Sequence, residues 1–343
     1  MSSERGERVL VTGGGGYIGT HLVLGLLSEG REVCVVDDFS NAYPEMLERV
    51  ARISQRKVET RRADICDLAA MDQVFADFRP DVVIHLAGLK SVPDSLAQPA
   101  AYYRTNVGGA AGLLETMERH GCRRMIFSST AALYADAVDR ANVETDPVVP
   151  VTPYARTKRV VEEMLDAWCA ADPERQAISL RYFNPVGADV SGEFGEHPKT
   201  AQQNLMPVLI EAALSKRPYV EVFGAAYPTP DGSGMRDFIH VSDLADAHIA
   251  ALRARPPGHR IYNVGTGKGI TVLGLINCFR SSVGVDVPYR VVDARAGDLG
   301  VSIANPQRIA EELGWKSKLS LDVMCRSAWK WATTVESGEA IAS

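Results

Sequence analysis

A tyrosine and a lysine, Tyr154 and Lys158, stand four positions apart in a segment that begins with a proline. Proline favours the first turn of a helix, and residues four apart share one helical face, so both side chains can reach one ligand. An ordinary tyrosine, with a pKa of about 10, is a poor base near neutrality. A nearby ammonium and the helix N-terminus favour the phenolate and lower that pKa. The spacing therefore predicts a proton-transfer centre in which Lys158 tunes Tyr154.

A run of hydroxyl side chains, from Ser128 to Thr130, follows a predicted strand over Arg124–Phe127. Ligands of open α/β sheets bind at the carboxyl ends of the strands. Thr130 can therefore offer a hydroxyl to the oxygen that Tyr154 deprotonates. A Ser-Ser-Thr run is also typical of solvated turns, so this interpretation depends on the cofactor signature that precedes it.

A glycine-rich turn lies between the first predicted strand, Arg8–Thr12, and the first predicted helix. Gly13, Gly16 and Gly19 form a G-x-x-G-x-x-G pattern. Glycine lets the backbone approach a pyrophosphate closely, and the N–H groups at the start of a helix favour its negative charge. A glycine-rich turn alone is weak evidence, but a strand before it and a helix after it are the context that a dinucleotide site requires.

Two acidic residues, Asp37 and Asp38, close the second predicted strand. A carboxylate there accepts hydrogen bonds from the adenosine ribose and repels a 2′-phosphate, so the sequence predicts NAD rather than NADP. Alternatively, Asp37 only begins a surface loop. After the third predicted strand, Asp64 and Ile65 are candidates for contacts with adenine, or else a cap and a core residue.

The segments that must position these residues alternate between strands and helices. Short β-branched runs predict strands over Arg8–Thr12, Glu32–Asp37, Lys57–Arg61, Val82–His85, Arg124–Phe127 and Ala177–Arg181. Helical spacing of apolar residues predicts helices over Ile18–Ser28, Met71–Phe78, Asn106–His120 and Tyr154–Ala170. This order predicts an α/β fold with a doubly wound parallel sheet of the Rossmann type.

The pattern changes after about Asn184, where loops rich in glycine and proline appear. Long loops in a compact domain are usually functional. We expect a dinucleotide-binding domain over residues 1–184 and a smaller α/β domain over residues 185–343 that binds the substrate. Residues 237–253 are expected to return to the first domain.

Composition and charge narrow the classes of function. The chain has 343 residues, 46% of them hydrophobic, and a formal net charge of −6. This acidic balance is not typical of nucleic-acid binding, and no stretch approaches the ~20 apolar residues of a membrane span. The charged N-terminus does not resemble a secretory signal, and the six cysteines lack the close spacing of a zinc site. We expect a cytoplasmic protein without a metal.

Over nearly its whole length, the sequence resembles the UDP-glucose (UDP-galactose) 4-epimerases of the extended short-chain dehydrogenase/reductase superfamily. Several segments carry the resemblance. They are Thr12–Gly19, His85–Lys90, Tyr102–Asn106, Arg181–Ala188, Asn204–Pro207, Tyr227–Thr229 with Asp231 and Gly232, and Arg236–Val241. Together these segments are highly specific for the family.

The resemblance implies a role for each residue that matches the family pattern. Tyr154 becomes the base, with Thr130 beside it and Lys158 in contact with the cofactor. The implied NAD site contains Gly13, Gly16, Tyr17, Ile18, Gly19, Asp37, Asp38, Asn41, Asp64, Ile65, Leu86, Ala87, Gly88, Lys90, Asn106, Ser128, Lys158 and Phe183. The implied UDP-hexose site contains Thr130, Tyr154, Asn184, Asn204, Leu205, Val222, Phe223, Arg236, Arg295, Asp298 and Ser302. The arginines would face the diphosphate and Phe223 would flank uracil, because a guanidinium donates several hydrogen bonds to phosphate oxygens.

The implied reaction inverts the C4 hydroxyl of a UDP-hexose. The C4 hydride passes to tightly bound NAD, the resulting 4-keto sugar turns over, and the hydride returns to its other face. The resemblance also implies a homodimer. An apolar stripe on the helix Tyr154–Ala170 could pack on the second copy or in the protein's own core. The stripe consists of Val160, Val161, Met164 and Trp168.

Other functions stay open. A sugar-nucleotide 4,6-dehydratase would carry an acid pair directly after the active-site threonine, where this chain has Ala131 and Ala132. A UDP-uronate 4-epimerase or decarboxylase needs only one further group that binds a carboxylate. A non-catalytic NAD(H) sensor is disfavoured by the intact Tyr154 and Lys158.

Departures from the family pattern bear on substrate choice. Thr130 replaces a serine, which retains the hydroxyl, whereas Pro93-Asp94, Ala135 and Gly300 leave the shape of their loops open. Ser302 is small where some relatives have a bulky aromatic residue. We therefore expect the protein to accept UDP-N-acetylglucosamine as well as UDP-glucose.

Overall fold

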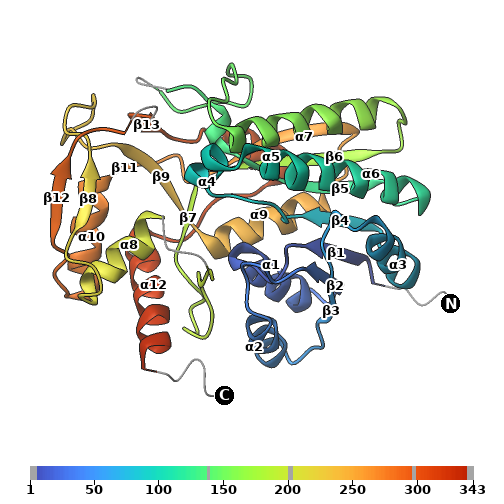
Figure 1. Cartoon of the computed structure of the whole chain (residues 1–343), viewed down its shortest axis with the longest axis horizontal. Helices are drawn as coiled ribbons and strands as arrows, with labels where there is room; N and C mark the ends of the chain where they lie inside the picture. Colours follow the sequence, from blue (N-terminus) through green and yellow to red (C-terminus); the bar gives the residue numbers. More distant parts are fainter. Residues whose placement is uncertain (1–5, 137–139, 200–203, 296–298, 338–343) are drawn as a thin grey trace. The chain divides into compact units, whose positions relative to one another are not determined.

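The computed structural model describes residues 6–136, 140–199, 204–295 and 299–337 (Figure 1). By their internal contacts, the residues form two compact units. The first unit contains Met1–Leu133, Pro150–Arg181 and Ala245–Tyr262, and the second contains Tyr134–Val149, Tyr182–Leu244 and Asn263–Ser343. Each unit is thus assembled from three stretches of chain. The sequence predicted a boundary at residue 184 and a return to the first domain over residues 237–253. In the structure, the stretch that returns is Ala245–Tyr262, and Tyr134–Val149 belongs to the second unit.

A seven-stranded sheet forms the centre of the first unit, with the strand order β10-β6-β5-β4-β1-β2-β3. The strands are β1 (Arg8–Thr12), β2 (Glu32–Asp37), β3 (Glu59–Arg62), β4 (Val82–His85), β5 (Arg124–Thr130), β6 (Gln176–Tyr182) and β10 (Gly258–Val264). Strand β1 pairs in parallel with both β2 and β4, so the order of connection reverses there. In open α/β sheets, ligands bind at such a reversal, beyond the carboxyl ends of the strands.

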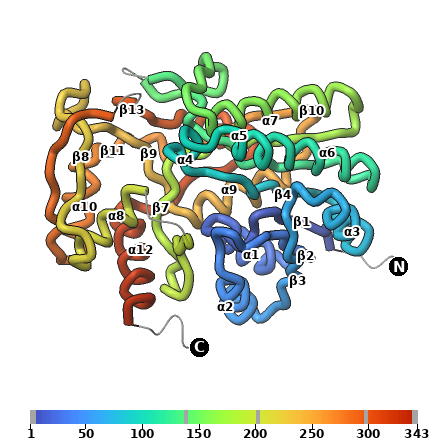
Figure 2. The backbone as a smooth tube through the Cα atoms, viewed as in Figure 1, coloured from blue at the N-terminus to red at the C-terminus, as the bar shows by residue number. Residues whose placement is uncertain are grey.

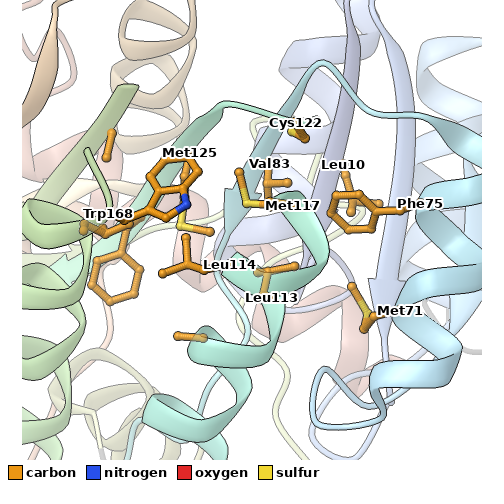
Figure 3. Close-up of a cluster of buried hydrophobic side chains, with 14 of the residues drawn as sticks. Leu10, Met71, Phe75, Val83, Leu113, Leu114, Met117, Cys122, Met125 and Trp168 are labelled. Atoms are coloured by element: carbon orange, nitrogen blue, oxygen red, sulfur yellow. The ribbon is translucent and has the colours of Figure 1, made fainter. Parts of the chain in front are cut away.

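Helices cover both faces of this sheet, as the tube in Figure 2 also shows. They are α1 (Tyr17–Ser28), α2 (Glu45–Ser54), α3 (Leu68–Phe78), α4 (Val92–Ala97), α5 (Pro99–Tyr102), α6 (Gly109–Arg119), α7 (Pro153–Ala170) and α9 (Val241–Arg253). On one face, α3, α6 and α7 share a buried cluster with the strands, which includes Leu10, Phe75, Leu113 and Trp168 (Figure 3). The other face is covered by α1 and α2, and Gly25 of α1 lies against Ile249 of α9. The predicted doubly wound α/β fold is confirmed.

Several predicted elements have different bounds in the structure, and two of these differences lie close to the catalytic candidates. Strand β5 continues to Thr130, so the Ser-Ser-Thr run belongs to the sheet and not to a turn. Ser129, the middle residue of this run, is buried and donates a hydrogen bond to Glu162. This bond satisfies the buried hydroxyl and explains how polar residues can continue the strand. The helix expected from Asn106 is preceded by a π-helical turn over Tyr103–Gly108, and α6 proper begins at Gly109.

The apolar stripe on α7 packs inside the first unit. Val161 and Trp168 are buried in the cluster beneath α7, and Met164 packs against that cluster. Three of the four stripe residues therefore contribute to the protein's own core, while Val160 and Met164 stay partly exposed.

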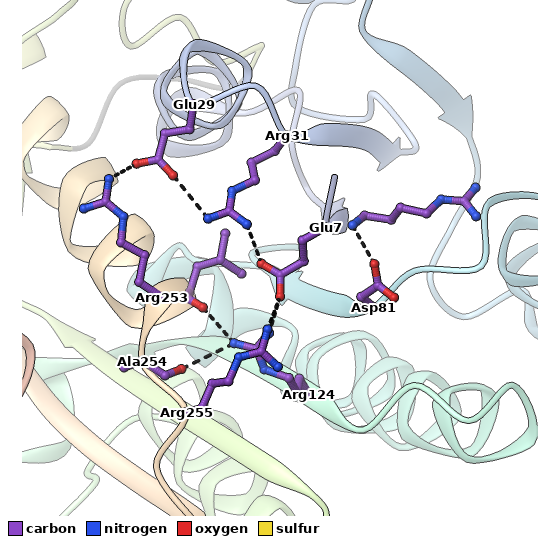
Figure 4. Close-up of polar contacts among 10 residues, drawn as sticks. Glu7, Glu29, Arg31, Asp81, Arg124, Arg253, Ala254 and Arg255 are labelled. Atoms are coloured by element: carbon purple, nitrogen blue, oxygen red, sulfur yellow. Dashed lines mark hydrogen bonds and ion pairs between the residues drawn. The ribbon is translucent and has the colours of Figure 1, made fainter. Parts of the chain in front are cut away.

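An ion network joins the amino ends of the strands to the end of α9 (Figure 4). The carboxylate of Glu7, just before β1, accepts hydrogen bonds from Arg31 at 2.9 Å, Arg124 at 2.5 Å and Arg255 at 2.9 Å. Arg124 also donates to the carbonyl of Leu252 at 2.7 Å. The network therefore fixes the end of α9, which is distant in sequence, to the amino-terminal ends of the strands. The glycine-rich turn lies at the opposite, carboxyl-terminal ends.

The second unit contains a four-stranded sheet and a two-stranded sheet. Their strands are β7 (Asn184–Val186), β9 (Met235–His240), β11 (Gly269–Thr271) and β13 (Val301–Ser302), and β8 (Val220–Phe223) with β12 (Tyr289–Val292). Its helices are α8 (Leu205–Ala213), α10 (Val272–Val283), α11 (Gln307–Leu313) and α12 (Leu321–Glu336). Its own buried cluster includes Val222, Phe238 and Phe279. No helix in the described ranges is long and apolar enough to cross a membrane.

The turn after β1 can be tested by adding one methyl group. Gly13 has φ +71°, and a Cβ there would lie 2.5 Å from the backbone nitrogen of Ala87. We expect Gly13→Ala to lower the unfolding midpoint in a thermal melt, because positive φ costs about 1 kcal/mol and the clash with backbone adds ~1–3 kcal/mol. Gly121→Ala is the matched control, since φ is +69° and nothing lies within 4 Å. Equal midpoints for the two variants would contradict the close approach.

Candidate active site

The amino end of α7 and the carboxyl end of β5 bring the predicted catalytic residues together. The hydroxyl of Thr152 caps α7 by accepting from the Ala155 N–H, and Tyr154 lies in the first turn. Tyr154 forms a side-chain hydrogen bond with Thr130, the last residue of β5. One helical turn later, the Nζ of Lys158 donates to the carbonyl oxygen of Ser128 at 2.7 Å. The spacing of Tyr154 and Lys158 thus places both against one strand end.

Within the protein alone, the pKa of Tyr154 lies above its ordinary value, whereas the sequence interpretation expected Lys158, the helix N-terminus and a nicotinamide cation together to lower it. Burial raises it, the hydrogen bond with Thr130 opposes this rise, and the nearby Tyr102 adds to it. The ammonium of Lys158 is directed at the Ser128 carbonyl and lies 4.8 Å from the centre of the Phe127 ring. Within the protein alone, therefore, desolvation of the phenolate outweighs any stabilisation by the lysine.

Lys158 and His85 are both buried in this region. Burial lowers the pKa of Lys158 to about 8, although the carboxylate of Glu162 acts in the other direction. Burial, and then the charge of Lys158, lower the pKa of His85 to about 3. His85 is therefore neutral at neutral pH, with its Nδ1 2.7 Å from the hydroxyl of Thr12, while Lys158 keeps its charge.

The glycine-rich turn has the shape that a dinucleotide requires. A Cβ at Gly19 would lie 2.6 Å from the carbonyl oxygen of Gly13, whereas the nearest atom to one at Gly16 is 3.4 Å away. The N-cap Gly16 has no side-chain cap, so the first turn of α1 offers its N–H groups to a ligand. Asp37 holds the turn from the next strand, since its Oδ2 accepts from the Gly15 N–H at 2.9 Å. The residues present fit the pyrophosphate and ribose of NAD.

The remaining cofactor candidates of the first unit lie in three places: the segment after β4, the start of α1, and the loops after β2 and β3. Leu86, Ala87, Gly88 and Lys90 lie in the segment after β4, and Tyr17 and Ile18 begin α1. Asp38 and Asp64 accept local hydrogen bonds from Ser40 and from the Cys66 N–H, and Asn41 is exposed. Ile65 is buried and lies against Gly109, which favours the core interpretation.

Asn106 has a role that its sequence position did not reveal. Its Oδ1 accepts from the Leu89 N–H at 2.8 Å, and its Nδ2 donates to the Leu89 carbonyl at 3.0 Å and to Thr157 at 3.0 Å. The amide thus fastens the segment after β4 to α7 beside Lys158. Phe183, also expected at the NAD site, belongs to the second unit, where its ring stacks with Tyr134.

In the second unit, three of the predicted substrate residues lie on strands that pair with one another. Arg236 of β9 is opposite Ser302 of β13, and Asn184 of β7 donates from its side chain to the carbonyl of Asp237 at 3.1 Å. Arg236 is half-buried and donates to the carbonyls of Met235 and Gly300. Ser302 is buried.

The other predicted substrate residues form separate contacts. The guanidinium of Arg295 covers the ring of Phe223, with its central carbon 3.5 Å from the ring centre. Val222 is a core residue, whereas Leu205 is half-buried at the start of α8. Asn204 donates to Glu196 at 2.7 Å. Asp298 lies outside the described residues.

Comparison with known proteins shows the family to which this chain belongs. The sequence profile of the NAD dependent epimerase/dehydratase family matches residues 9–265. A UDP-glucose 4-epimerase of Dictyostelium discoideum is 43% identical over 335 residues, which are 97% of this chain and 97% of that protein. The chain belongs to the NAD dependent epimerase/dehydratase family, among its UDP-glucose 4-epimerases.

Solved structures of this epimerase family share the fold. The UDP-glucose 4-epimerase of Stenotrophomonas maltophila, with bound NAD and formylated UDP-arabinopyranose, has a TM-score of 0.93 and 41% identity and covers 97% of this chain and 99% of its own. The enzyme of Bifidobacterium longum, in complex with NAD+ and UDP, has a TM-score of 0.93 and 40% identity and covers 96% and 99%. NAD is therefore the cofactor of this family fold.

The sequence argument missed residues that support the epimerase site. Asp136 accepts from the N–H groups of Gly300 and Val301 at 2.9 and 3.0 Å, so it fixes the start of β13. Glu162 and Arg181 form a buried ion pair behind β5. A signal for Glu162 was present, because it stands four residues after Lys158 and shares its helical face. Nothing in the sequence indicated the contact of Asp136.

A cavity of about 760 Å³ lies at the amino ends of the strands, away from Tyr154 and the glycine-rich turn. It is lined by Arg79, Arg119, Arg123, Arg124 and Arg255, among other residues. Most of these arginines are paired: Arg119 with Asp72, Arg123 with Glu174, and Arg124 and Arg255 with Glu7. None of the predicted catalytic, cofactor or substrate residues that the structure describes lines this cavity, so it is separate from the candidate active site.

Proposed function

We propose that this protein is an NAD-dependent isomerase that interconverts UDP-hexoses at C4, with UDP-glucose and UDP-galactose as substrates. The observation that carries the proposal is the meeting of Tyr154, Thr130 and Lys158 at the end of β5, in the unit that also contains the dinucleotide turn. Membership in the epimerase family supports it. A cytosolic location, expected from the sequence, and a homodimer, implied by the family resemblance, belong to the same proposal.

The catalytic residues have distinct tasks in this proposal. When bound, NAD supplies a place for the C4 hydride and returns it to the sugar. Tyr154 accepts the proton of the C4 hydroxyl through its phenolic oxygen and gives it back after the 4-keto sugar has turned. Thr130 orients that oxygen through its hydrogen bond with Tyr154. Because burial raises the pKa of Tyr154, the phenolate requires positive charge nearby, which Lys158 contributes.

Residues of each unit have a ligand in this proposal. Gly13, Gly16, Gly19 and Asp37 hold the NAD pyrophosphate and ribose, with Leu86 to Lys90 beside them. Arg236 and Arg295 bind the UDP diphosphate, and Phe223 and Asn204 flank the nucleotide. Arg295 covers one face of Phe223, so uracil would have to flank the other face of the ring. An anchored UDP group leaves the hexose able to rotate, which C4 inversion requires.

The experiment that tests the function incubates the protein with UDP-galactose, UDP-N-acetylgalactosamine and UDP-galacturonate separately and follows the C4 epimers by NMR. We expect UDP-glucose to form from UDP-galactose without added reductant. Tyr154→Phe protein serves as the blank. Conversion of UDP-galacturonate alone would replace the proposal by a uronate 4-epimerase, and no epimer from any sugar would refute it.

Substrate breadth is tested at Ser302, which is buried opposite Arg236. We expect wild-type protein to epimerise UDP-N-acetylglucosamine as well as UDP-glucose, since serine leaves room for the acetamido group. Ser302→Tyr adds a ring's volume, and overpacking costs ~1–3 kcal/mol, which lowers kcat/KM for the N-acetyl sugar about ten- to a hundredfold. Ser302→Ala is the control and should keep both activities. An equal loss for both sugars in Ser302→Tyr would exclude Ser302 as the gate.

A further inference from the structure

A buried ion pair joins α7 to β6 next to the strand end where the proposed catalytic residues meet. The side chain of Glu162 on α7 is 0% exposed and that of Arg181 on β6 is 2% exposed. Arg181 donates from Nε to one carboxylate oxygen at 2.9 Å and from its terminal nitrogen to the other at 2.7 Å. Taking two charges out of water is costly, and such a pair often adds nothing to stability over apolar residues of similar size. A role in arranging the site explains the pair better than stability does.

The ion pair reaches β5 through one hydroxyl group. The Oγ of Ser129 donates to the carboxylate of Glu162 at 2.6 Å. Ser129 is flanked in the strand by the two groups that contact the proposed catalytic residues. The carbonyl of Ser128 accepts from Lys158, and the hydroxyl of Thr130 bonds with Tyr154. The hydrogen bond that fixes Ser129 therefore also fixes the position of the Ser128 carbonyl before it and of Thr130 after it.

We propose that Glu162, braced by Arg181, is a positioning residue for the epimerase reaction. Through Ser129 it sets the end of β5 against α7, so that the Ser128 carbonyl fixes Lys158 and the Thr130 hydroxyl fixes Tyr154. The inference rests on the proposed function and adds a support that the family resemblance did not include.

The charge of Glu162 gives this brace a second effect. Burial alone disfavours the ammonium of Lys158, and Glu162 is the group that favours it. His85 from β4, whose low pKa keeps it neutral, and the Phe127 ring from β5 also face Lys158. Tyr154 lies one turn earlier on the same face of α7, and its raised pKa keeps it a neutral phenol within the protein alone. Arg181 is cationic and pairs with Glu162 from β6, and Arg159 lies 3.7 Å from the same carboxylate. Removing the carboxylate therefore moves the pKa of Lys158 downward.

Two variants separate position from charge. Ser129→Ala breaks the link to β5 but leaves the ion pair intact. Glu162→Gln leaves an oxygen that can accept from Ser129 but removes the charge. The matched control is Glu163→Gln, one residue along the same helix, where an exposed carboxylate pairs with Arg159 at 2.9 Å. The measurements are kcat and KM for UDP-galactose from pH 6 to about pH 10, the dissociation constant for NAD, and the thermal midpoint.

We expect Ser129→Ala to lower kcat about tenfold or more at every pH, with KM and NAD affinity within about twofold of wild type. Glu162→Gln should move the alkaline limb of kcat to lower pH, because the ammonium is lost sooner. An unpaired buried Arg181 can prevent folding of Glu162→Gln. In that case Ser129→Ala, a small change that leaves the ion pair intact, tests the positioning role by itself.

Each outcome has one interpretation. Wild-type kcat in Ser129→Ala, or a loss no larger than in Glu163→Gln, refutes the positioning role while leaving the proposed function in place. A parallel rise in KM and in the NAD dissociation constant would show general damage to the fold and also refute it. An inactive wild-type protein would refute the proposed function itself, and this inference with it.

Discussion

Replacing Tyr154 with phenylalanine lowers kcat for UDP-galactose by at least ~10², the lower range for loss of a general acid or base. The ring keeps its place at the start of α7, and only the phenolic oxygen that bonds with Thr130 is removed. The glycine-rich turn and Asp37 are untouched, so NAD affinity stays within about twofold of wild type. Steady-state kinetics and a fluorescence titration with NAD measure the two quantities.

Tyr103→Phe is the control for this result, because Tyr103 is a nearby tyrosine with an exposed side chain. It removes one phenolic hydroxyl from the same unit and should leave kcat unchanged. Near-normal turnover by Tyr154→Phe would transfer the role of base to another group. A loss of NAD binding in that variant would instead make Tyr154 a structural residue.

Replacing Lys158 with methionine has the second largest expected effect, a loss of kcat of about 10²-fold together with weaker binding of NAD. Methionine fills the space of the lysine stem but cannot donate to the Ser128 carbonyl, which Lys158 now reaches at 2.7 Å. It also removes the positive charge that a phenolate at Tyr154 needs. Lys316→Met, at an exposed lysine, is the control. Unchanged kcat would show that Lys158 neither tunes nor positions the base.

Lys158→Met should raise the free energy of unfolding although it lowers kcat, and the size of this gain depends on pH. The pKa of Lys158 falls from 10.5 to about 8 on folding, so burial of the ammonium costs about 3 kcal/mol below pH 8. Between pH 8 and 10.5 the unfolded chain binds more protons, and the wild-type free energy of unfolding rises. Lys158→Met should therefore be the more stable protein at pH 7, with an advantage that shrinks toward pH 10. An advantage independent of pH in denaturant titrations would contradict the buried charge.

The two effects together describe Lys158 as a residue kept at a cost to stability. Functional sites commonly hold buried charges that the rest of the fold must support. Here the support comes from Glu162, which favours the ammonium, and from a neutral His85, which adds no second cation.

The sequence determined those features that depend on near neighbours along the chain. Strands β1, β2 and β4 begin and end where the β-branched runs predict, because those runs are buried on both faces of the sheet. The spacing of Tyr154 and Lys158 places them on one helical face, since four residues make about one helical turn. Gly13 predicts its turn because only glycine tolerates both the positive φ and the contact with Ala87.

Tertiary structure alone decided which distant residues meet and what their charges do. Local spacing did not show that β5 continues through Ser129, because the reason is a carboxylate on a helix 33 residues later. The stacking of Arg295 on Phe223 and the bonds from Gly300 and Val301 to Asp136 likewise join residues far apart in sequence. The sign of the Tyr154 pKa shift depended on burial, which is a property of the packed chain. Spacing sets which side chains share a face, whereas desolvation and long-range hydrogen bonds arise only when the elements are packed together.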